Sequence, residues 1–187
     1  MITRALKKYS ALELVILALV ASLGIATKPV ISPLAHVLTG PLFIPGGVVA
    51  GGFYMLWIVL GAGLVNRRGA ATVICLVQAM LIVALGLYGN HGIMSFFTYL
   101  FPGLAVDLVF WLGLNSAAFF AAGALANISG SFLVNLVFFR LPWIPLVLSL
   151  STAALSGGLG GLLAFAIVNR LRASGLLSGR AEGSEGR

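Results

Sequence analysis

Residues 47–69 read GVVAGGFYMLWIVLGAGLV-NRRG, an apolar run from Gly47 to Val65 that ends in a short polar turn. A bilayer core about 30 Å thick needs roughly 20 apolar helical residues, so this run predicts a membrane-spanning helix. A second apolar run follows the turn directly, from Ala70 to about Tyr88, and ends at the turn residues 89–92, GNHG. The stretch therefore predicts two successive membrane crossings.

The composition of the whole chain agrees with a membrane protein. Of its 187 residues, 60% are hydrophobic and only 8% are charged, against about 25% charged in an average soluble domain. So few charges cannot cover a water-facing surface, which excludes a soluble domain, and the many aliphatic and aromatic residues exclude disorder. Four acidic residues leave almost nothing for paired-carboxylate catalysis. The fold class predicted is an all-α membrane protein.

Six spans are predicted along the chain, with the long apolar stretch after residue 93 divided at Asn115-Ser116. The predicted spans are 11–26, 47–65, 70–88, 98–114, 117–139 and 146–170. Residues 28–46 and 89–101 are predicted to be loops on the outer side. Residues 1–173 then form a single transmembrane domain, and the Gly-, Ser-, Arg- and Glu-rich residues 174–187 form a flexible cytoplasmic tail.

The distribution of basic residues predicts the orientation in the membrane. Six spans place both termini on one side, together with nine basic residues, whereas the other side has only Lys28 and Arg140. The nine are Arg4, Lys7, Lys8, Arg67, Arg68, Arg170, Arg172, Arg180 and Arg187. Because basic residues concentrate in cytoplasmic segments, both termini are predicted to be cytoplasmic in a multi-pass protein of the cell membrane.

Asp107 is the one carboxylate deep within a predicted span. An ionisable group there is costly and is a functional candidate by default, although it can also join neighbouring helices. Trp111 lies one turn further along the same helix face, so the two side chains together could hold a hydrogen-bonding or cationic aromatic ligand. The alternative for Trp111 is packing against lipid or the core.

A polar stripe runs along the fifth span, where Asn127, Ser131 and Asn135 are spaced four residues apart. Amides facing lipid would lack hydrogen-bond partners, so the stripe is expected to face protein or a cavity. Helix–helix hydrogen bonding and ligand contact both remain open. Further candidate contacts are His36 in the first outer loop and Asn90 and His91 in the second; with no Cys or carboxylate near them, no metal site is predicted.

Ala18, Ser22 and Ala26 form a small-residue ridge on the first span. Such ridges let helices approach closely, either within the protein's own bundle or at a separate membrane subunit. The chain has no G-x-x-x-x-G-K-[ST] phosphate loop, no H-E-x-x-H and no G-x-S-x-G. It is therefore predicted to be neither an ATPase nor an enzyme, to need no cofactor, and to act as a binding subunit.

The stretch Gly40–Ala71 resembles the substrate-binding membrane subunits (S-components) of energy-coupling-factor vitamin transporters, of the thiamine or hydroxymethylpyrimidine group. A relative's pattern G-P … P … G-x-W-F … R-x-G-A-A matches Gly40-Pro41, Pro45, the Gly51–Trp57 region and the residues around Arg67-Arg68-Gly69-Ala70-Ala71. Gly89-Asn90 also matches, and the Gly/Leu-rich Ser156–Leu163 followed by Leu171–Leu177 is similar to the family's last helix and its cytoplasmic exit.

The resemblance implies six helices and an outward-opening pocket lined by helices four to six. It also implies docking of Ala18, Ser22 and Ala26 onto a coupling subunit that carries two ATPase subunits. Relatives that bind thiamine have acidic residues in the third and fourth helices, whereas the third helix here offers Cys75 and Gln78. This departure counts against thiamine itself and leaves a less charged heterocycle or another vitamin open. The resemblance implies uptake of a vitamin or vitamin precursor, with a thiamine-related heterocycle as the leading candidate.

Two other functions are compatible with the sequence. A stand-alone secondary transporter or channel would need a continuous polar path, for which few deep polar residues are available. A lipid-modifying enzyme would need a catalytic pair, and only Asp107 and His91 offer one, although they are separated by about half the membrane thickness.

Overall fold

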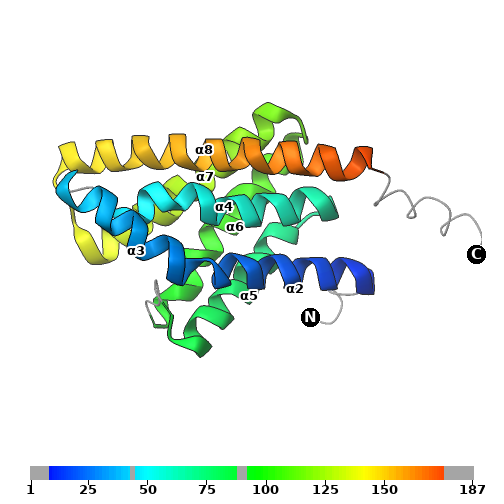
Figure 1. Ribbon diagram of the computed structural model, residues 1–187, viewed down its shortest axis with the longest axis horizontal. Helices are drawn as coiled ribbons and strands as arrows, with labels where there is room; N and C mark the ends of the chain where they lie inside the picture. Colours follow the sequence, from blue (N-terminus) through cyan, green and yellow to red (C-terminus); the bar gives the residue numbers. More distant parts are fainter. Residues whose placement is uncertain (1–8, 43–44, 88–91, 175–187) are drawn as a thin grey trace, which may run out of the picture.

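The computed structural model describes residues 9–42, 45–87 and 92–174, and this part of the chain is built of helices (Figure 1). In chain order the elements are α2 (Ala11–Ala26), α3 (Lys28–Thr39), the 3-10 turn η1 (Gly40–Leu42), α4 (Gly46–Val65), α5 (Ala70–Leu85), α6 (Met94–Leu112), α7 (Ser116–Val134), the π-helix η2 (Asn135–Phe139) and α8 (Trp143–Ala173). The predicted all-α class is confirmed, and a helix covers most of each predicted span. Beyond Ser174 the predicted tail lies outside the described residues.

Two polar caps explain where helices begin. Ser10 and Glu13 form a capping box at the start of α2, in which the Ser10 hydroxyl accepts a hydrogen bond from the Glu13 backbone N–H. The buried Glu13 carboxylate also pairs with Arg67, 3.2 Å away, and so ties α2 to the turn between α4 and α5. Asn115 caps α7 by accepting from the backbone N–H of Ala118 at 2.8 Å. The predicted break at Asn115-Ser116 is confirmed.

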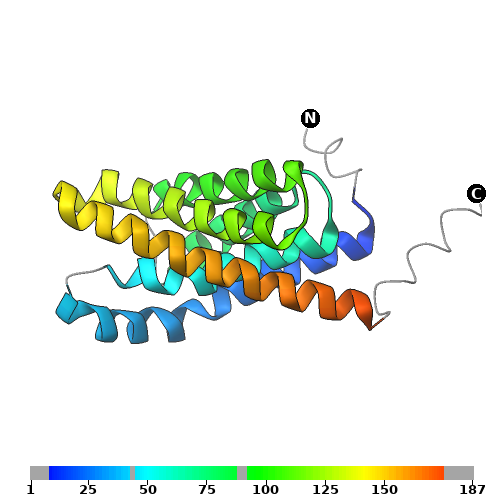
Figure 2. The same ribbon diagram turned by 90° about the horizontal axis from the view of Figure 1, so that it is seen from above.

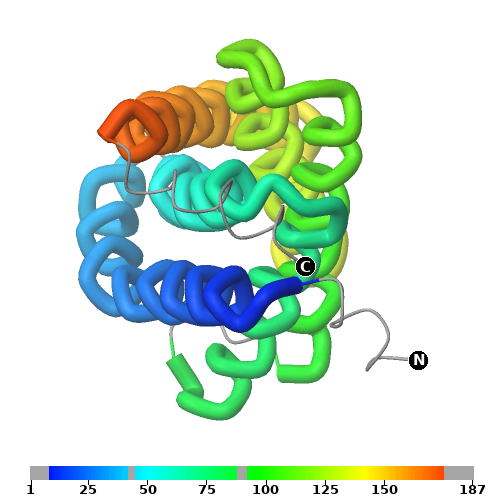
Figure 3. Tube along the Cα trace, turned by 90° about the vertical axis from the view of Figure 1, so that its right-hand side faces the viewer, coloured from blue at the N-terminus to red at the C-terminus, as the bar shows by residue number. Residues whose placement is uncertain are grey.

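Helix α4 lies in the middle of the bundle, as the end-on view in Figure 3 shows, and it contacts every other long helix. Glycines of α8 permit its close contacts with α4 and α7: a Cβ on Gly160 would meet the Gly52 backbone of α4, and a Cβ on Gly157 would meet the Gly123 backbone of α7. Small residues let helix backbones approach closely, so the backbone of α8 comes close to those of α4 and α7 at these glycines. The glycine-rich stretch of α8 is therefore part of the bundle's own core.

The predicted loop at residues 28–46 is wrong in its first two-thirds, because Lys28–Thr39 form helix α3. Pro29 lies in the first turn, where a missing N–H costs little, and it bends the α2–α3 pair by 40°. The helix continues through Pro33 because one face, with Ser32, Ala35 and Thr39 buried, packs against α4. Packing against the bundle therefore outweighs the loss of one backbone hydrogen bond.

Four described helices are long and apolar enough to cross a membrane, and the bent α2–α3 pair makes a possible fifth span. Helix α5 is apolar but shorter, with 16 residues. The chain is thus a multi-pass integral membrane protein, while the count of six spans stays a prediction.

The two ends of the bundle differ in character. Figure 2 shows that α2 begins and α8 ends at the same end of the bundle, and α3 and η2 lie at the opposite end. The first end has Arg67, Arg68, Arg170 and Arg172, and is called the basic end below. The opposite end contains the main cavity and is called the cavity end.

Candidate ligand-binding cavity

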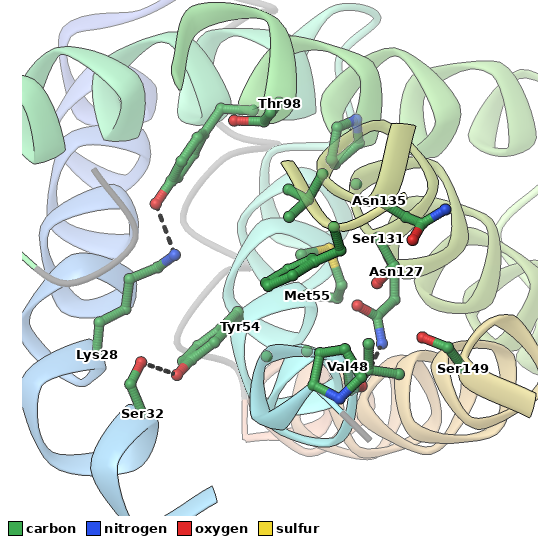
Figure 4. Close-up of a pocket in the computed structure, with 18 of the residues that line it drawn as sticks. Lys28, Ser32, Val48, Tyr54, Met55, Thr98, Asn127, Ser131, Asn135 and Ser149 are labelled. Atoms are coloured by element: carbon green, nitrogen blue, oxygen red, sulfur yellow. Dashed lines mark hydrogen bonds between the residues drawn. The ribbon is translucent and has the colours of Figure 1, made fainter. Parts of the chain in front are cut away.

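A cavity of about 320 Å³ lies at the cavity end, and each of the long helices α2 to α8 contributes to its lining. Its walls are mainly apolar, with polar side chains placed singly around them. The polar lining residues are Lys28, Ser32, His36, Tyr54, Gln78, Thr98, Tyr99, Asn127, Ser131, Asn135 and Ser149. Figure 4 shows Lys28, Ser32 and Tyr54 on one side of the cavity, with Asn127, Asn135 and Ser149 on the other. An apolar hollow with convergent polar groups is typical of a small-molecule site.

Asn127 joins three helices at the cavity wall. Its side-chain NH₂ group donates to the carbonyl oxygens of Val48 in α4 and Ala153 in α8, both at 3.0 Å. These two bonds use both donors of the amide, so Oδ1 is left as the acceptor, and it lies against Gly51, which also lines the cavity. The structure thus shows interhelical hydrogen bonding at Asn127 and a fixed acceptor beside the cavity.

Asn135 begins the π-helix η2, two stripe positions after Asn127. Its Oδ1 accepts a hydrogen bond from the Leu141 backbone N–H at 2.9 Å, which stabilises the turn before α8. That bond uses one of the two lone pairs of the oxygen, and the amide NH₂ group remains as a donor for another contact. With Ser131 between them, Asn127 and Asn135 line one cavity, whereas contact of the stripe with a ligand stays a prediction.

Lys28 enters the cavity from the bend between α2 and α3. Its Nζ donates to the Tyr99 hydroxyl at 2.6 Å and lies 4.5 Å and 4.7 Å from the ring centres of Tyr54 and Tyr99. The Tyr54 hydroxyl in turn shares a 2.6 Å hydrogen bond with Ser32. This arrangement holds a cation between two aromatic faces, which is favourable because the ring faces carry negative electrostatic potential.

Asp107 does not share this cavity, so the expectation that Asp107, Trp111 and the stripe form one site is corrected. Its carboxylate accepts hydrogen bonds from the backbone N–H groups of Ala71 and Thr72, at 3.2 and 2.9 Å, and from the Thr72 hydroxyl at 2.5 Å. The N-terminus of α5 attracts a negative charge, which explains a carboxylate in α6 at this position. Trp111 is 66% exposed and has the Arg68 guanidinium 5.4 Å from its ring centre. Both residues line a second, smaller cavity at the basic end.

The remaining predicted residues have different placements. His36 is exposed and lines the main cavity, and its Nδ1 hydrogen-bonds the Ser32 carbonyl at 2.7 Å. Asn90 and His91 lie outside the described residues. Ala18, Ser22 and Ala26 are all exposed on α2, so the ridge is a free surface of this chain rather than a contact within its bundle.

Sequence reasoning missed Lys28, Tyr54 and Tyr99 as cavity residues. The available signal is a lysine beside Pro29 between two apolar segments, a position that the local sequence predicts to be an outer loop. Tyr54 and Tyr99 carried no signal, because tyrosines are common in membrane helices and at their ends. Only the tertiary structure brings these three residues together.

Comparison with known proteins gives two matches. The sequence model of the ABC-type cobalt transport system permease component matches residues 12–132, which is well over half of the chain. The chain belongs to this family. The permeases of the family are transport components and not enzymes, in agreement with the prediction of a non-enzymatic membrane subunit. The comparison with curated proteins gave no match.

The bundle is also similar to a solved structure described as an S-component of an energy-coupling-factor transporter. The TM-score is 0.76 at 24% sequence identity, and the similarity covers 95% of this chain and 92% of the other. At this level of identity, the similarity shows that this permease and the solved S-component share a fold. The predicted S-component-like bundle is thereby confirmed as a fold.

Proposed function

We propose that this permease is the substrate-binding subunit of an energy-coupling-factor transporter and that it binds a vitamin or vitamin precursor, most specifically a thiamine-related heterocycle. The observation that carries the proposal is the cavity at one end of an S-component-like bundle, lined by residues from every long helix, with polar side chains from α3 to α8. Its volume, about 320 Å³, is at the lower end of the range for small-molecule sites, which suits a single heterocycle.

The lining chemistry supports an organic heterocycle. Asn127 Oδ1 offers an acceptor to a ligand amino group, and the Asn135 NH₂ group offers a donor to a ring nitrogen or hydroxyl. Apolar and aromatic residues between them suit a flat ring. The family description names cobalt, but within the described ranges no three His, Cys, Asp or Glu side chains gather as a metal site would require. An aminopyrimidine-like ligand uses more of the groups that line the cavity.

The positions of charged residues support an orientation with the basic end in the cytoplasm of a prokaryotic cell. Arg67, Arg68, Arg170 and Arg172 lie at that end, and Lys28 and Arg140 lie toward the other. With both termini cytoplasmic, the cavity opens to the outside, where an uptake protein must collect its ligand. His36 in α3 then lies at the outer side of the site, and Asn90 and His91, which fall between α5 and α6 in the sequence, are further candidate contacts.

Energy must come from partners, since the chain has no phosphate-binding loop. The proposed partners are a coupling subunit and two ATPase subunits, which meet the exposed ridge of Ala18, Ser22 and Ala26 on α2. Small exposed residues leave room for a partner helix to approach closely, with the surrounding lipid displaced.

Reconstitution in liposomes tests the proposal against a stand-alone transporter. The purified chain alone should bind a labelled thiamine-related ligand without moving it into the lumen. Uptake should appear only when a coupling subunit with its ATPases and ATP are added. The variant Ala18→Leu should retain ligand binding and lose most uptake, with Leu19→Ala on the lipid-exposed surface as the matched control. Uptake by the chain alone would favour the secondary transporter, and no binding of any such ligand would refute the proposal.

A further inference from the structure

Lys28 lines the main cavity, and its ammonium group has surroundings that are unusual for a charged side chain within a membrane protein. Its Nζ is bound to the Tyr99 hydroxyl and stacked over the rings of Tyr54 and Tyr99. Among the described residues, no Asp or Glu lines this cavity. A cation buried in a membrane protein normally pairs with an anion, so the missing counter-charge needs an explanation.

The carboxylates of the described chain are already engaged at the basic end. Glu13 caps α2 and pairs with Arg67, while Asp107 caps α5. Neither can swing to Lys28, because each is held by several hydrogen bonds on a rigid helix. The Tyr99 hydroxyl accepts one of the three ammonium hydrogens, and the ring faces supply a partial negative potential. The ammonium therefore keeps donor capacity toward the cavity that it lines.

We propose that Lys28 sets the charge preference of the cavity: it donates to an acceptor group of the ligand, either an anionic carboxylate or phosphate or a neutral ring nitrogen, and it repels a permanently cationic ligand. This inference rests on the proposed function and refines it. Among thiamine-related compounds it selects the neutral pyrimidine precursor and its anionic phosphate ester over thiamine, whose thiazolium ring carries a fixed positive charge.

The expected preference follows from Coulomb's law. A cationic ligand about 5 Å from the Lys28 ammonium is repelled, whereas a neutral ligand is not. In surroundings between water and protein interior, this repulsion weakens binding on the order of tenfold. Opposite charges at the same distance gain a similar factor. The ranking expected is therefore anion first, neutral second and cation last, with roughly tenfold steps.

Competition binding to the full-length protein in detergent tests the proposal, with hydroxymethylpyrimidine, its phosphate ester and thiamine as the three probes. The unmodified protein should bind thiamine about tenfold more weakly than hydroxymethylpyrimidine. Lys28→Gln retains a hydrogen-bond donor without the charge and should bring the three affinities within about threefold of one another. Lys28→Arg retains the charge and should preserve the ranking, so it is the matched control.

The outcomes separate this inference from the function on which it rests. If thiamine binds the unmodified protein as tightly as hydroxymethylpyrimidine, or if Lys28→Gln leaves the affinity ratios unchanged, the charge preference is refuted while ligand binding stands. If none of the probes binds, both the charge preference and the proposed function fail. Because the ranking in the unmodified protein is itself decisive, a variant that does not fold leaves the test intact.

Discussion

Replacing Asp107 with asparagine should weaken the fold and leave ligand binding in the main cavity unchanged. The carboxylate accepts from two backbone N–H groups and one hydroxyl at the start of α5. An asparagine presents one acceptor oxygen and an NH₂ group, so at least one backbone N–H loses its partner. Such a hydrogen bond to a charged group contributes about 1.5–3 kcal/mol, and the charge at a helix N-terminus about 0.3–1 kcal/mol. Because Asp107 is only partly buried, the expected loss is about 2 kcal/mol in the free energy of unfolding.

Denaturant unfolding in detergent micelles, followed by circular dichroism, measures this loss. The variant Thr72→Ala removes only the hydroxyl bond and should cost about 1 kcal/mol, which makes it the graded comparison. Ligand affinity is measured on the same preparations. An Asp107→Asn protein of unchanged stability that no longer binds ligand would refute this assignment and restore Asp107 to the binding site.

Two further predictions concern the bundle. Gly157→Ala places a Cβ against the backbone of Gly123, so it should separate α7 from α8. Denaturant unfolding should then give a free energy of unfolding about 2 kcal/mol lower. The control is Gly47→Ala, whose Cβ meets nothing within 4 Å and which should leave the stability unchanged. Glu13→Gln removes the charge paired with Arg67, whose side chain is 55% exposed, and should cost about 1 kcal/mol. A thermal-unfolding scan at low and high salt checks it, since a salt-independent loss would contradict an ionic origin.

Most of the helices could be predicted from the sequence, because their positions depend on local composition. An apolar run such as Gly47–Val65 must pair its backbone groups internally in a membrane, so its length and boundaries follow from hydropathy and turn residues. Helix α3 was not predicted, because Pro29 and Pro33 argue locally for a loop. What stabilises α3 is its packing against α4, which no local pattern contains.

The candidate site could be predicted only in part, because the sequence shows which residues share a helix face but not which helices meet. The spacing of Asn127, Ser131 and Asn135 places them on one helix face, and amides need partners, so the cavity could be anticipated there. Asp107 was assigned wrongly to the same site, because its depth along a helix does not say which neighbour it faces. Lys28 was overlooked because its bend and its two tyrosine neighbours depend on how distant helices meet.

The central claim is that a small heterocyclic solute occupies the cavity lined by the α7 stripe. Equilibrium binding of labelled hydroxymethylpyrimidine to three purified proteins tests it most directly. Ser131→Leu fills the cavity, while Ser129→Leu alters a residue of the same helix outside the cavity lining. The unmodified protein and Ser129→Leu should each bind one ligand per chain with similar affinity, and Ser131→Leu should bind at least tenfold more weakly. Equal affinity in all three proteins would contradict the account.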